Sequence, residues 1–528
     1  MRNQTSALIL VLFWFLNLTF STAAQTLSEE QIDNLLKKVE VQTIDAREMA
    51  LVPLRVILEV ALERSLSMGA SRLGEESARS ALTGARERNH PSIQTSYGLS
   101  KNPSSSFSSS SSCSGYACGS SSTTNTMSAT FTQRLDSGIT YGLTLTDTVS
   151  KSTQLIRPEE GGTVKSGTTF DPSGKSSLRS FVSIPFFQDS GFEINNIPVK
   201  MAEIAVDRAG WSTRLTRLNL LKQIASIYWD MVGIYESIEV QKKSVALSNQ
   251  LLSDNEARSR AGLLRATEVM AAETQLLRDR QILDSLKYDA LRVEDQVRAA
   301  LNLPELPVGL FPSDKPRERL EDLPDKKELL KKIIGKDSQL ALNRASLMQN
   351  RHEIQQLKNR MDTNLDLDLS YTLNGYSKST MGGTGDFGSS DLQGMSASLS
   401  WVFPIGDRNT QEQLKQKNLE RRQIELQMQE RESELGVTVE SILRSIRLFG
   451  HELQTAKKVI KLYENQLENE ILRSKVGQST SFQLSQHQKN SAESRQQEIM
   501  IRVRLEKAFL ELLVLSEDLF DYYQINID

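Results

Sequence analysis

The hydrophobic residues of this chain recur with two different periods. In long, charged stretches they return every three or four positions, which places them on one face of an α-helix. These stretches are rich in Leu, Glu, Gln, Lys, Arg and Ala, residues that favour helices, and their narrow apolar stripes indicate coiled-coil-like packing. The pattern predicts helices over residues 27–40, 55–89, 193–259, 263–302, 326–361, 409–474 and 479–524.

A second set of segments alternates hydrophobic and polar residues one by one. Residues 365–371 read LDLDLSY, and residues 395–403 read MSASLSWVF. Strands of about ten residues with one apolar face and one polar face are typical of an outer-membrane β-barrel, with lipid outside and water inside. Half-buried strands of a soluble sheet are the alternative. We predict strands over residues 91–100, 139–148, 365–371 and 395–403, within strand regions of about 127–187 and 363–403.

Low-complexity segments separate the predicted strands. Residues 104–122 are mostly serine and residues 382–390 are rich in glycine, so neither segment buries enough apolar surface to order itself. Cys113 and Cys118 are the two cysteines of the chain, and both lie in the serine-rich segment. In an exported protein we expect two cysteines this close to form a small disulfide loop. Free thiols are the alternative.

The order of these elements occurs twice along the chain. In each copy a strand ends at a proline, Pro185 or Pro404, which opens a long helix that ends at a glycine, Gly262 or Gly477. Proline does not pair inside a strand but tolerates the start of a helix, which explains its place at this junction. Each long helix extends about 100 Å at 1.5 Å per residue. We therefore expect a first repeat over 25–310, with a helix hairpin at 193–302, and a second over 311–528, with helix 326–361 and a hairpin at 409–524.

The start of the chain has the features of a secretory signal peptide. Arg2 precedes an apolar stretch over residues 7–20, and small residues follow at Ala23 and Ala24. This arrangement predicts a signal peptide over residues 1–24 and an exported mature chain. A membrane anchor is the alternative. After residue 25 no apolar run reaches the roughly 18 residues that a transmembrane helix needs.

Charge and composition narrow the classes of function. The chain has 63 basic and 66 acidic residues, a formal net charge of −3, whereas a nucleic-acid binder would show a basic surplus. Two cysteines and four scattered histidines leave little material for a metal or redox site. The sequence contains no nucleophile elbow and no phosphate-binding glycine loop in a strand–helix context. We therefore expect neither a cofactor, a metal, a nucleic-acid partner nor an enzymatic activity.

The duplicated pattern resembles the outer membrane efflux protein family, the TolC-like channels. The resemblance rests on the two prolines and on two turns, RSRAG at 258–262 and RSKVG at 473–477, and it covers the chain from about Leu54 to Phe520. It implies a mainly α fold with a membrane β-barrel: a trimeric 12-stranded barrel, four strands per subunit, continuous with a long periplasmic α-helical barrel. It also implies the bacterial outer membrane as location, and a passive exit duct for drug efflux or type I protein secretion. The implied partners are two further copies of the chain, outer-membrane lipid, a periplasmic adaptor (membrane fusion) protein and an inner-membrane pump.

The resemblance assigns roles to the two glycine turns. They would dock the adaptor and close the tunnel at rest, although plain solvation of a helix end is the alternative for their basic side chains. Family members often carry acidic residues just beyond the turn, where this chain has Glu268, Gln483 and Gln486, so a strongly cation-selective gate is in doubt. An ordinary solvated helix residue is the alternative for Glu268. The candidate docking residues are Arg258, Arg260, Gly262, Arg473, Lys475 and Gly477.

Two further features qualify the resemblance. Segments 27–53 and 303–325 interrupt the helices and would form a belt around the tower. Residues 127–135 and 139–148 form an extra hairpin, which either lies outside the membrane or adds strands to the barrel; twelve strands remain the expectation. The competing hypothesis is an exported coiled-coil structural or adhesin-like protein without a pore, which predicts that strands 91–100 and 365–371 do not pair.

Overall fold

The computed structural model describes residues 40–44, 47–103, 107–109, 116–157, 162–303, 308–317, 323–476 and 478–525. The predicted signal peptide, nearly all of the predicted helix 27–40, Cys113 and Gly477 lie outside these residues. The described part of that helix prediction is wrong at its last residue, since Glu40 begins a strand. The chain divides into two compact units, each built from both predicted repeats: unit 1 is Met1–Gly69, Arg217–Ile333 and Val437–Asp528, and unit 2 is Ala70–Thr216 and Ile334–Gly436.

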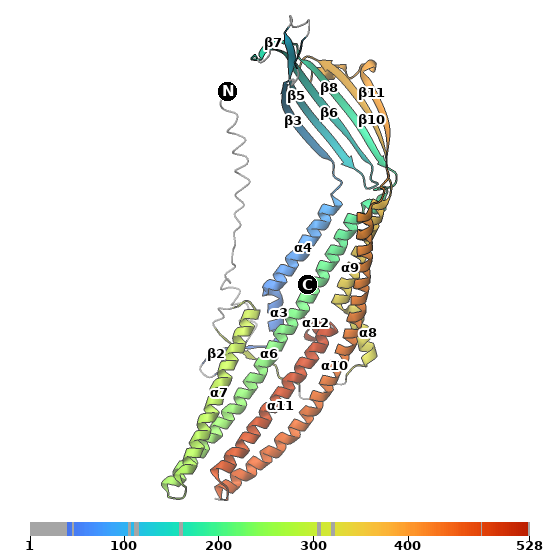
Figure 1. Cartoon of the computed structure of the whole chain (residues 1–528). Helices are drawn as coiled ribbons and strands as arrows, with labels where there is room; N and C mark the ends of the chain where they lie inside the picture. Colours follow the sequence, from blue (N-terminus) through green and yellow to red (C-terminus); the bar gives the residue numbers. More distant parts are fainter. Residues whose placement is uncertain are drawn as a thin grey trace. The chain divides into compact units, whose positions relative to one another are not determined.

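Unit 2 contains one large antiparallel sheet (Figure 1). Its strands follow the order β11-β10-β8-β6-β5-β3 within the described residues, and two short strands, β4 and β7, pair with β5 and β6. The strand pairing predicted at 91–100 and 365–371 is confirmed, so the non-pairing that a pore-less coiled-coil protein predicts is wrong. The strands are β3 Ser92–Pro103, β4 Ser108–Ser109, β5 Ala117–Arg134, β6 Thr140–Arg157, β7 Lys165–Thr169, β8 Ser173–Pro185, β10 Asn364–Ser377 and β11 Gln393–Val402.

The sheet of unit 2 contains more long strands than the four per subunit that the resemblance implies for the barrel. The described residues form six long strands on one continuous path, because β5 and β6 lie between β3 and β8. β5 pairs with β3 from Thr132 opposite Ser92, and β6 pairs with β8 from Thr140 opposite Ser183. The extra hairpin is therefore part of the sheet, and each of its strands has 18 residues.

The helices follow the predicted segments, with breaks that the hydrophobic period did not show. The segment 55–89 is two helices that part at Ser65, and 326–361 is two helices that part at Asp337. Asp337 explains its break, because its side chain accepts a 2.7 Å hydrogen bond from the Leu340 backbone and so caps a new helix. The elements are α4 Leu66–Arg86, α5 Phe192–Asn195, α9 Ser338–Met361, the 3-10 helices η2 Gly382–Asp386 and η3 Ser390–Leu392, and the first parts of α6 Ile197–Arg260 and α10 Arg408–Lys475.

Unit 1 combines the remaining parts of α6 and α10 with further helices and a small sheet. Its core is aliphatic and aromatic, with Leu58, Leu221, Ile224 and Tyr228 almost completely buried. In the described residues no helix combines the length and the apolar character that a membrane span requires. The other elements are α3 Leu54–Arg64, α7 Ala266–Ala300, α8 Lys326–Lys336, α11 Ser481–Leu515, α12 Leu519–Tyr523, β1 Glu40–Ile44, β2 Arg47–Val52 and β9 Gly309–Pro312.

Hydrogen-bonded carboxylates fix the small sheet to the helices of unit 1. Strand β2 pairs antiparallel with β1 and parallel with β9, which joins the described parts of the two segments predicted to form a belt. Glu294 on α7 is almost fully buried and accepts hydrogen bonds from Arg298 at 2.7 Å and from the Leu310 backbone at 3.0 Å. Tyr228 donates its hydroxyl hydrogen toward Asp314 at 2.8 Å, and burial raises the pKa of this hydroxyl. These contacts satisfy polar groups that would otherwise be costly to bury.

Candidate functional site

The first predicted tip turn is a closed helix ending within unit 1. Helix α6 ends at Arg260, and Gly262 adopts a positive φ of 75°. The Leu263 backbone donates to the Arg258 carbonyl and the Gly262 backbone donates to that of Ser259, both at 2.9 Å. This pair of bonds is the Schellman motif, in which glycine avoids the strain that a left-handed backbone imposes on other residues. The left-handed backbone of this turn therefore explains why the residue at position 262 is glycine. Helix α7 begins four residues later.

The second predicted tip turn repeats this geometry. The Gln478 backbone donates to the Arg473 carbonyl at 2.9 Å, five residues back, as Leu263 does to Arg258. Gly477 and the Lys475 side chain lie outside what the structure describes. The two copies of the sequence pattern thus give the same backbone bond at equivalent positions.

The basic residues beside the turns differ in how they are engaged. Arg258 donates from Nη1 to the carbonyl of Ser474 at 3.1 Å, so it connects the end of α6 to the end of α10. A cation is favourable there because a helix C-terminus carries partial negative charge. The Arg260 side chain is 78% exposed, and among the described residues it reaches only Glu256 of its own helix, at 3.8 Å. Arg473 is half-exposed and contacts Glu470 at 3.3 Å.

Glu268 forms a second link between the two helix hairpins. Its Oε2 accepts a 3.2 Å hydrogen bond from the Ser481 backbone, in the first turn of α11. A carboxylate is favourable at a helix N-terminus, where backbone N–H groups lack helical partners. Asn255 on α6 donates to the Ser481 hydroxyl at 2.9 Å in the buried interior. The residue predicted to line a constriction therefore holds α7 against α11 within one chain.

The two glutamines predicted as constriction residues lie on the first turns of α11. Gln483 completes a capping box: Thr480 accepts from the Gln483 backbone at 3.2 Å, and the Gln483 side chain accepts from the Thr480 backbone at 3.3 Å. The spacing Thr-x-x-Gln is readable from sequence as a capping signal, so this role could have been found. Gln486 is exposed and donates to Asn490 at 2.9 Å.

Some apolar residues pack between the helices of the tip hairpins, and others are exposed at the ends of the hairpins. Leu251, Ala272 and Leu484 form a small buried cluster between α6, α7 and α11. Beyond it, at or next to the turns, large apolar side chains are exposed to solvent. They are Leu263, Val476 and Phe482.

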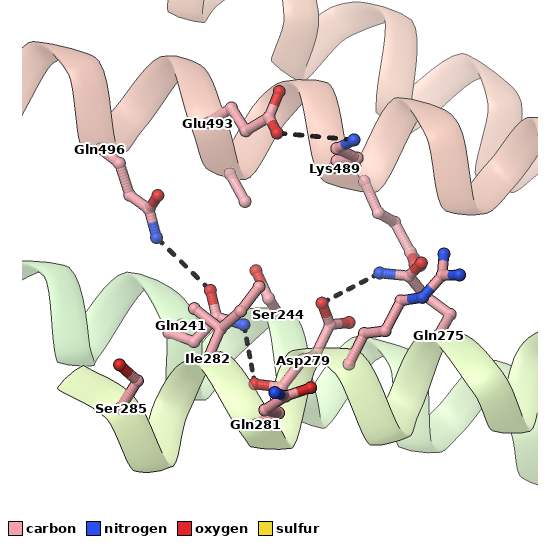
Figure 2. A pocket seen from close by; sticks show the side chains of 13 residues that line it. Gln241, Ser244, Gln275, Asp279, Gln281, Ile282, Ser285, Lys489, Glu493 and Gln496 are labelled. Atoms are coloured by element: carbon pink, nitrogen blue, oxygen red, sulfur yellow. Dashed lines mark hydrogen bonds and ion pairs between the residues drawn. The ribbon is translucent and has the colours of Figure 1, made fainter. Parts of the chain in front are cut away.

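A polar cavity of about 500 Å³ lies between α6, α7 and α11, farther from the turns than this cluster (Figure 2). Asp279 lines it and accepts hydrogen bonds from Ser248 at 2.5 Å and from Gln275 at 2.9 Å. Gln241 donates to the Asp279 backbone carbonyl at 2.9 Å. The buried amide of Gln488 has no hydrogen-bond partner among the described residues. The sequence does not reveal this cavity, because its residues occupy ordinary polar positions of three separate helices.

The remaining predicted residues lie at the ends of sheet strands in unit 2. Pro185 is the last residue of β8, opposite Asp366, and Pro404 follows β11 by two residues. Both lead toward a long helix, as the repeat predicts. Cys118 on β5 is disulfide-bonded, so a free thiol at Cys118 is ruled out. Its predicted partner Cys113 lies outside the described residues, and the pairing of the two stays a prediction.

Comparisons with known proteins agree with this architecture. Residues 57–303 match the model of the family described as outer membrane efflux protein. No protein of the curated set matches the sequence.

Solved structures share the fold over most of the chain at low sequence identity. The outer membrane protein VceC of Vibrio cholerae superposes with a TM-score of 0.60 and 13% identity, covering 88% of this chain and 96% of VceC. The CmeC outer membrane channel of Campylobacter jejuni gives 0.60 and 10% identity, covering 90% of each chain. The MtrE outer membrane channel of Neisseria gonorrhoeae gives 0.58 and 14% identity, covering 88% of each chain. Residues 57–303 are therefore similar to the outer membrane efflux protein family, and the chain shares the fold of solved outer-membrane channels over most of its length.

Proposed function

We propose that this protein is the outer-membrane exit duct of a tripartite export system, passive and gated at its helix tips. In this proposal three copies form the duct, an inner-membrane pump supplies the energy, and a periplasmic adaptor protein connects the two. The two predicted repeats, 25–310 and 311–528, each supply one of the two tip hairpins. The cargo is a small molecule in an efflux system or an unfolded protein in a type I secretion system.

The observation that carries the proposal is the two-faced sheet of unit 2. On one face large apolar side chains are exposed to the surroundings, among them Ile93, Leu143, Met395 and Trp401. The opposite face carries mostly serine, threonine and glycine from the alternate positions. A soluble protein would pay a large cost for exposing so much apolar surface, whereas lipid covers it without cost. The polar face then suits a water-filled lumen.

The contacts between the two tip hairpins supply a gate. Arg258 with the Ser474 carbonyl, and Glu268 with the Ser481 backbone, both join α6–α7 to α10–α11 of the same chain. Opening a tunnel at the tips by moving one hairpin past the other would break both bonds. Their loss sets part of the free-energy difference between the closed and open states.

The ends of the hairpins supply a docking surface for the adaptor. Leu263 and Phe482 are 78% and 70% exposed. The exposed cation of Arg260 and the half-exposed cation of Arg473 lie on the adjoining helix ends. Apolar anchors with a charged rim are typical of protein–protein interfaces. We expect an adaptor that presents apolar side chains and carboxylates to this surface.

Conductance in planar lipid bilayers tests the proposal. Full-length protein purified from outer membranes in detergent should run as a heat-sensitive trimer and should insert into bilayers as discrete conductance steps. A matched preparation, heated until the trimer band is lost, should give none. Folded trimer that never produces a step, in wild type and in tip variants alike, would overturn the proposal.

A further inference from the structure

The strands of the extra hairpin, β5 and β6, pair with β3 and β8 over nearly the whole length of those two strands. β3 and β5 pair over twelve consecutive positions, from Ser92 with Thr132 to Pro103 with Ser121. β6 and β8 pair over eleven, from Thr140 with Ser183 to Ser150 with Ser173. No register shift occurs in either ladder. The hairpin therefore takes the place that a direct contact between β3 and β8 would otherwise occupy.

The hairpin also continues both faces of the sheet. At one level the paired residues form a row across all six strands that is apolar at five of its positions. The neighbouring row, on the opposite face, is polar or glycine throughout. The apolar row is Ile93, Phe131, Leu143, Ser180, Tyr371 and Met395, and the polar row is Gln94, Thr130, Thr144, Arg179, Thr372 and Gly394.

The length of the apolar part of the hairpin fits a membrane crossing. Alternate positions are large and apolar from Tyr141 to Leu145 on β6 and at Met127 and Phe131 on β5. Beyond Ser150 the strand becomes mostly polar on both faces. From Tyr141 to Val149 the apolar face of β6 spans nine residues, with the buried Asp147 between Leu145 and Val149, and this is about the length that a transmembrane β-strand requires. The rest of each strand extends past the apolar zone. A hairpin that projected into water would not need an apolar face matched to that of its neighbours.

The two edge strands of the sheet are complementary. β3 and β11 are the ends of the strand path within the described residues, and every residue of β3 is exposed. Six antiparallel strands leave β3 and β11 running in opposite directions, so the β3 edge of one copy can pair antiparallel with the β11 edge of the next. An unpaired edge is a site for pairing with another chain, and closure of a ring removes it.

We propose that three copies close an eighteen-stranded barrel, six strands from each, in which the β5–β6 hairpin widens the lumen. This inference rests on the proposed function for the number of copies and for insertion in lipid. Because barrel diameter grows roughly in proportion to strand number, the lumen is about 1.5 times as wide as that of a twelve-stranded barrel. Its cross-section is about twice as large, so the sheet admits bulkier cargo than a twelve-stranded relative would.

Electron paramagnetic resonance on neighbouring spin-labelled positions tests the inference. In a Cys113→Ser, Cys118→Ser background, Leu143→Cys and Thr144→Cys place labels on the two faces of β6. Leu369→Cys and Ser370→Cys are the matched pair on β10, a strand outside the extra hairpin. In liposomes we expect oxygen, which concentrates in lipid, to relax the labels at 143 and 369. A water-soluble nickel chelate should relax those at 144 and 370, with a several-fold contrast in each pair.

The two pairs separate the outcomes. If the β10 pair shows the contrast and the β6 pair is open to nickel at both positions, the hairpin lies outside the membrane and the inference is wrong while the proposed function stands. If neither pair shows the contrast, the sheet is not in lipid and both fail. Phe131→Cys replaces Leu143→Cys if that variant does not assemble. Native mass spectrometry should count three copies, and two copies would give twelve strands and overturn the wider lumen.

Discussion

Replacing Arg258 by glutamine should open the proposed gate, whereas the same change two residues later should not. Arg258 donates to the Ser474 carbonyl and so joins the two tip hairpins, while Arg260 contacts only Glu256 of its own helix within the part of the chain that the structure describes. Both lie in the last turn of α6 and have the same side chain. Arg260→Gln is therefore a matched control for the loss of a positive charge at this helix end.

The structure sets the size of the expected effect. A hydrogen bond from a charged donor contributes roughly 1.5–3 kcal/mol. Arg258 is half-buried, so solvent screening reduces this to about 1–2 kcal/mol per copy. The open-to-closed ratio should then rise about 5- to 30-fold for one contact, since about 1.4 kcal/mol is a factor of ten, and further if three copies open together. The exposed Arg260–Glu256 pair should contribute under about 0.5 kcal/mol.

Single-channel recording in planar bilayers measures this ratio as open probability. Arg258→Gln should raise it well above the wild-type value, and Arg260→Gln should leave it nearly unchanged, in preparations with equal trimer content. Equal open probabilities for Arg258→Gln and wild type would show that the contact does not restrain the closed state. An equal rise in both variants would show that charge alone, and not the link to α10, is responsible.

Three further predictions concern buried charge, pH and selectivity. Glu294→Gln should increase hydrogen exchange at β9 by about 30-fold or more, because disrupting a buried ion pair costs several kcal/mol. Asp295→Asn, at an exposed neighbour, should change the exchange little. Similar exchange in both variants would refute the role of Glu294. Burial raises the pKa of Glu353, but hydrogen bonds, chiefly from Lys417, outweigh it and lower that pKa. The stabilisation from Glu353 is therefore complete above the pKa of about 4.3 that the group has in the unfolded chain, and it is lost as the pH falls through the lower pKa of the folded protein. Glu353→Gln should weaken the dependence of the free energy of unfolding on pH below about pH 4.5. An unchanged pH dependence would contradict this. Gln486→Asp should raise cation selectivity in bilayer conductance, and unchanged selectivity would mean that Gln486 does not line the constriction.

Local signals in the sequence predicted the individual elements well. The long helices and the strands at 91–100, 139–148 and 365–371 occur where their periods place them, because each period reflects one local geometry. The breaks at Ser65 and Asp337 escaped that reasoning, since neither interrupts the apolar stripe. The capping box of Gln483 is readable in the sequence from Thr480, three residues before it.

Non-local partners could not be read from the sequence. Glu268 and Ser481 are 213 residues apart, and nothing near Glu268 marks it as a partner of that helix end. The number of strands in the sheet was left open for a similar reason. The first half of β5 is a tract of serine and threonine without alternation, and its place between β3 and β8 is decided by pairing with both neighbours. The family resemblance supplied a default of four strands, and the hairpin adds two long strands to the sheet.

Electron cryo-microscopy of the full-length protein in lipid nanodiscs tests the central claim most directly. The account predicts three copies around one axis and a closed ring of eighteen strands at the level of Leu143 and Leu369. β3 of each copy should pair with β11 of the next, and the Ser- and Thr-rich face should enclose an open lumen. A ring that omits β5 and β6, or a sheet whose edges do not close, would contradict it.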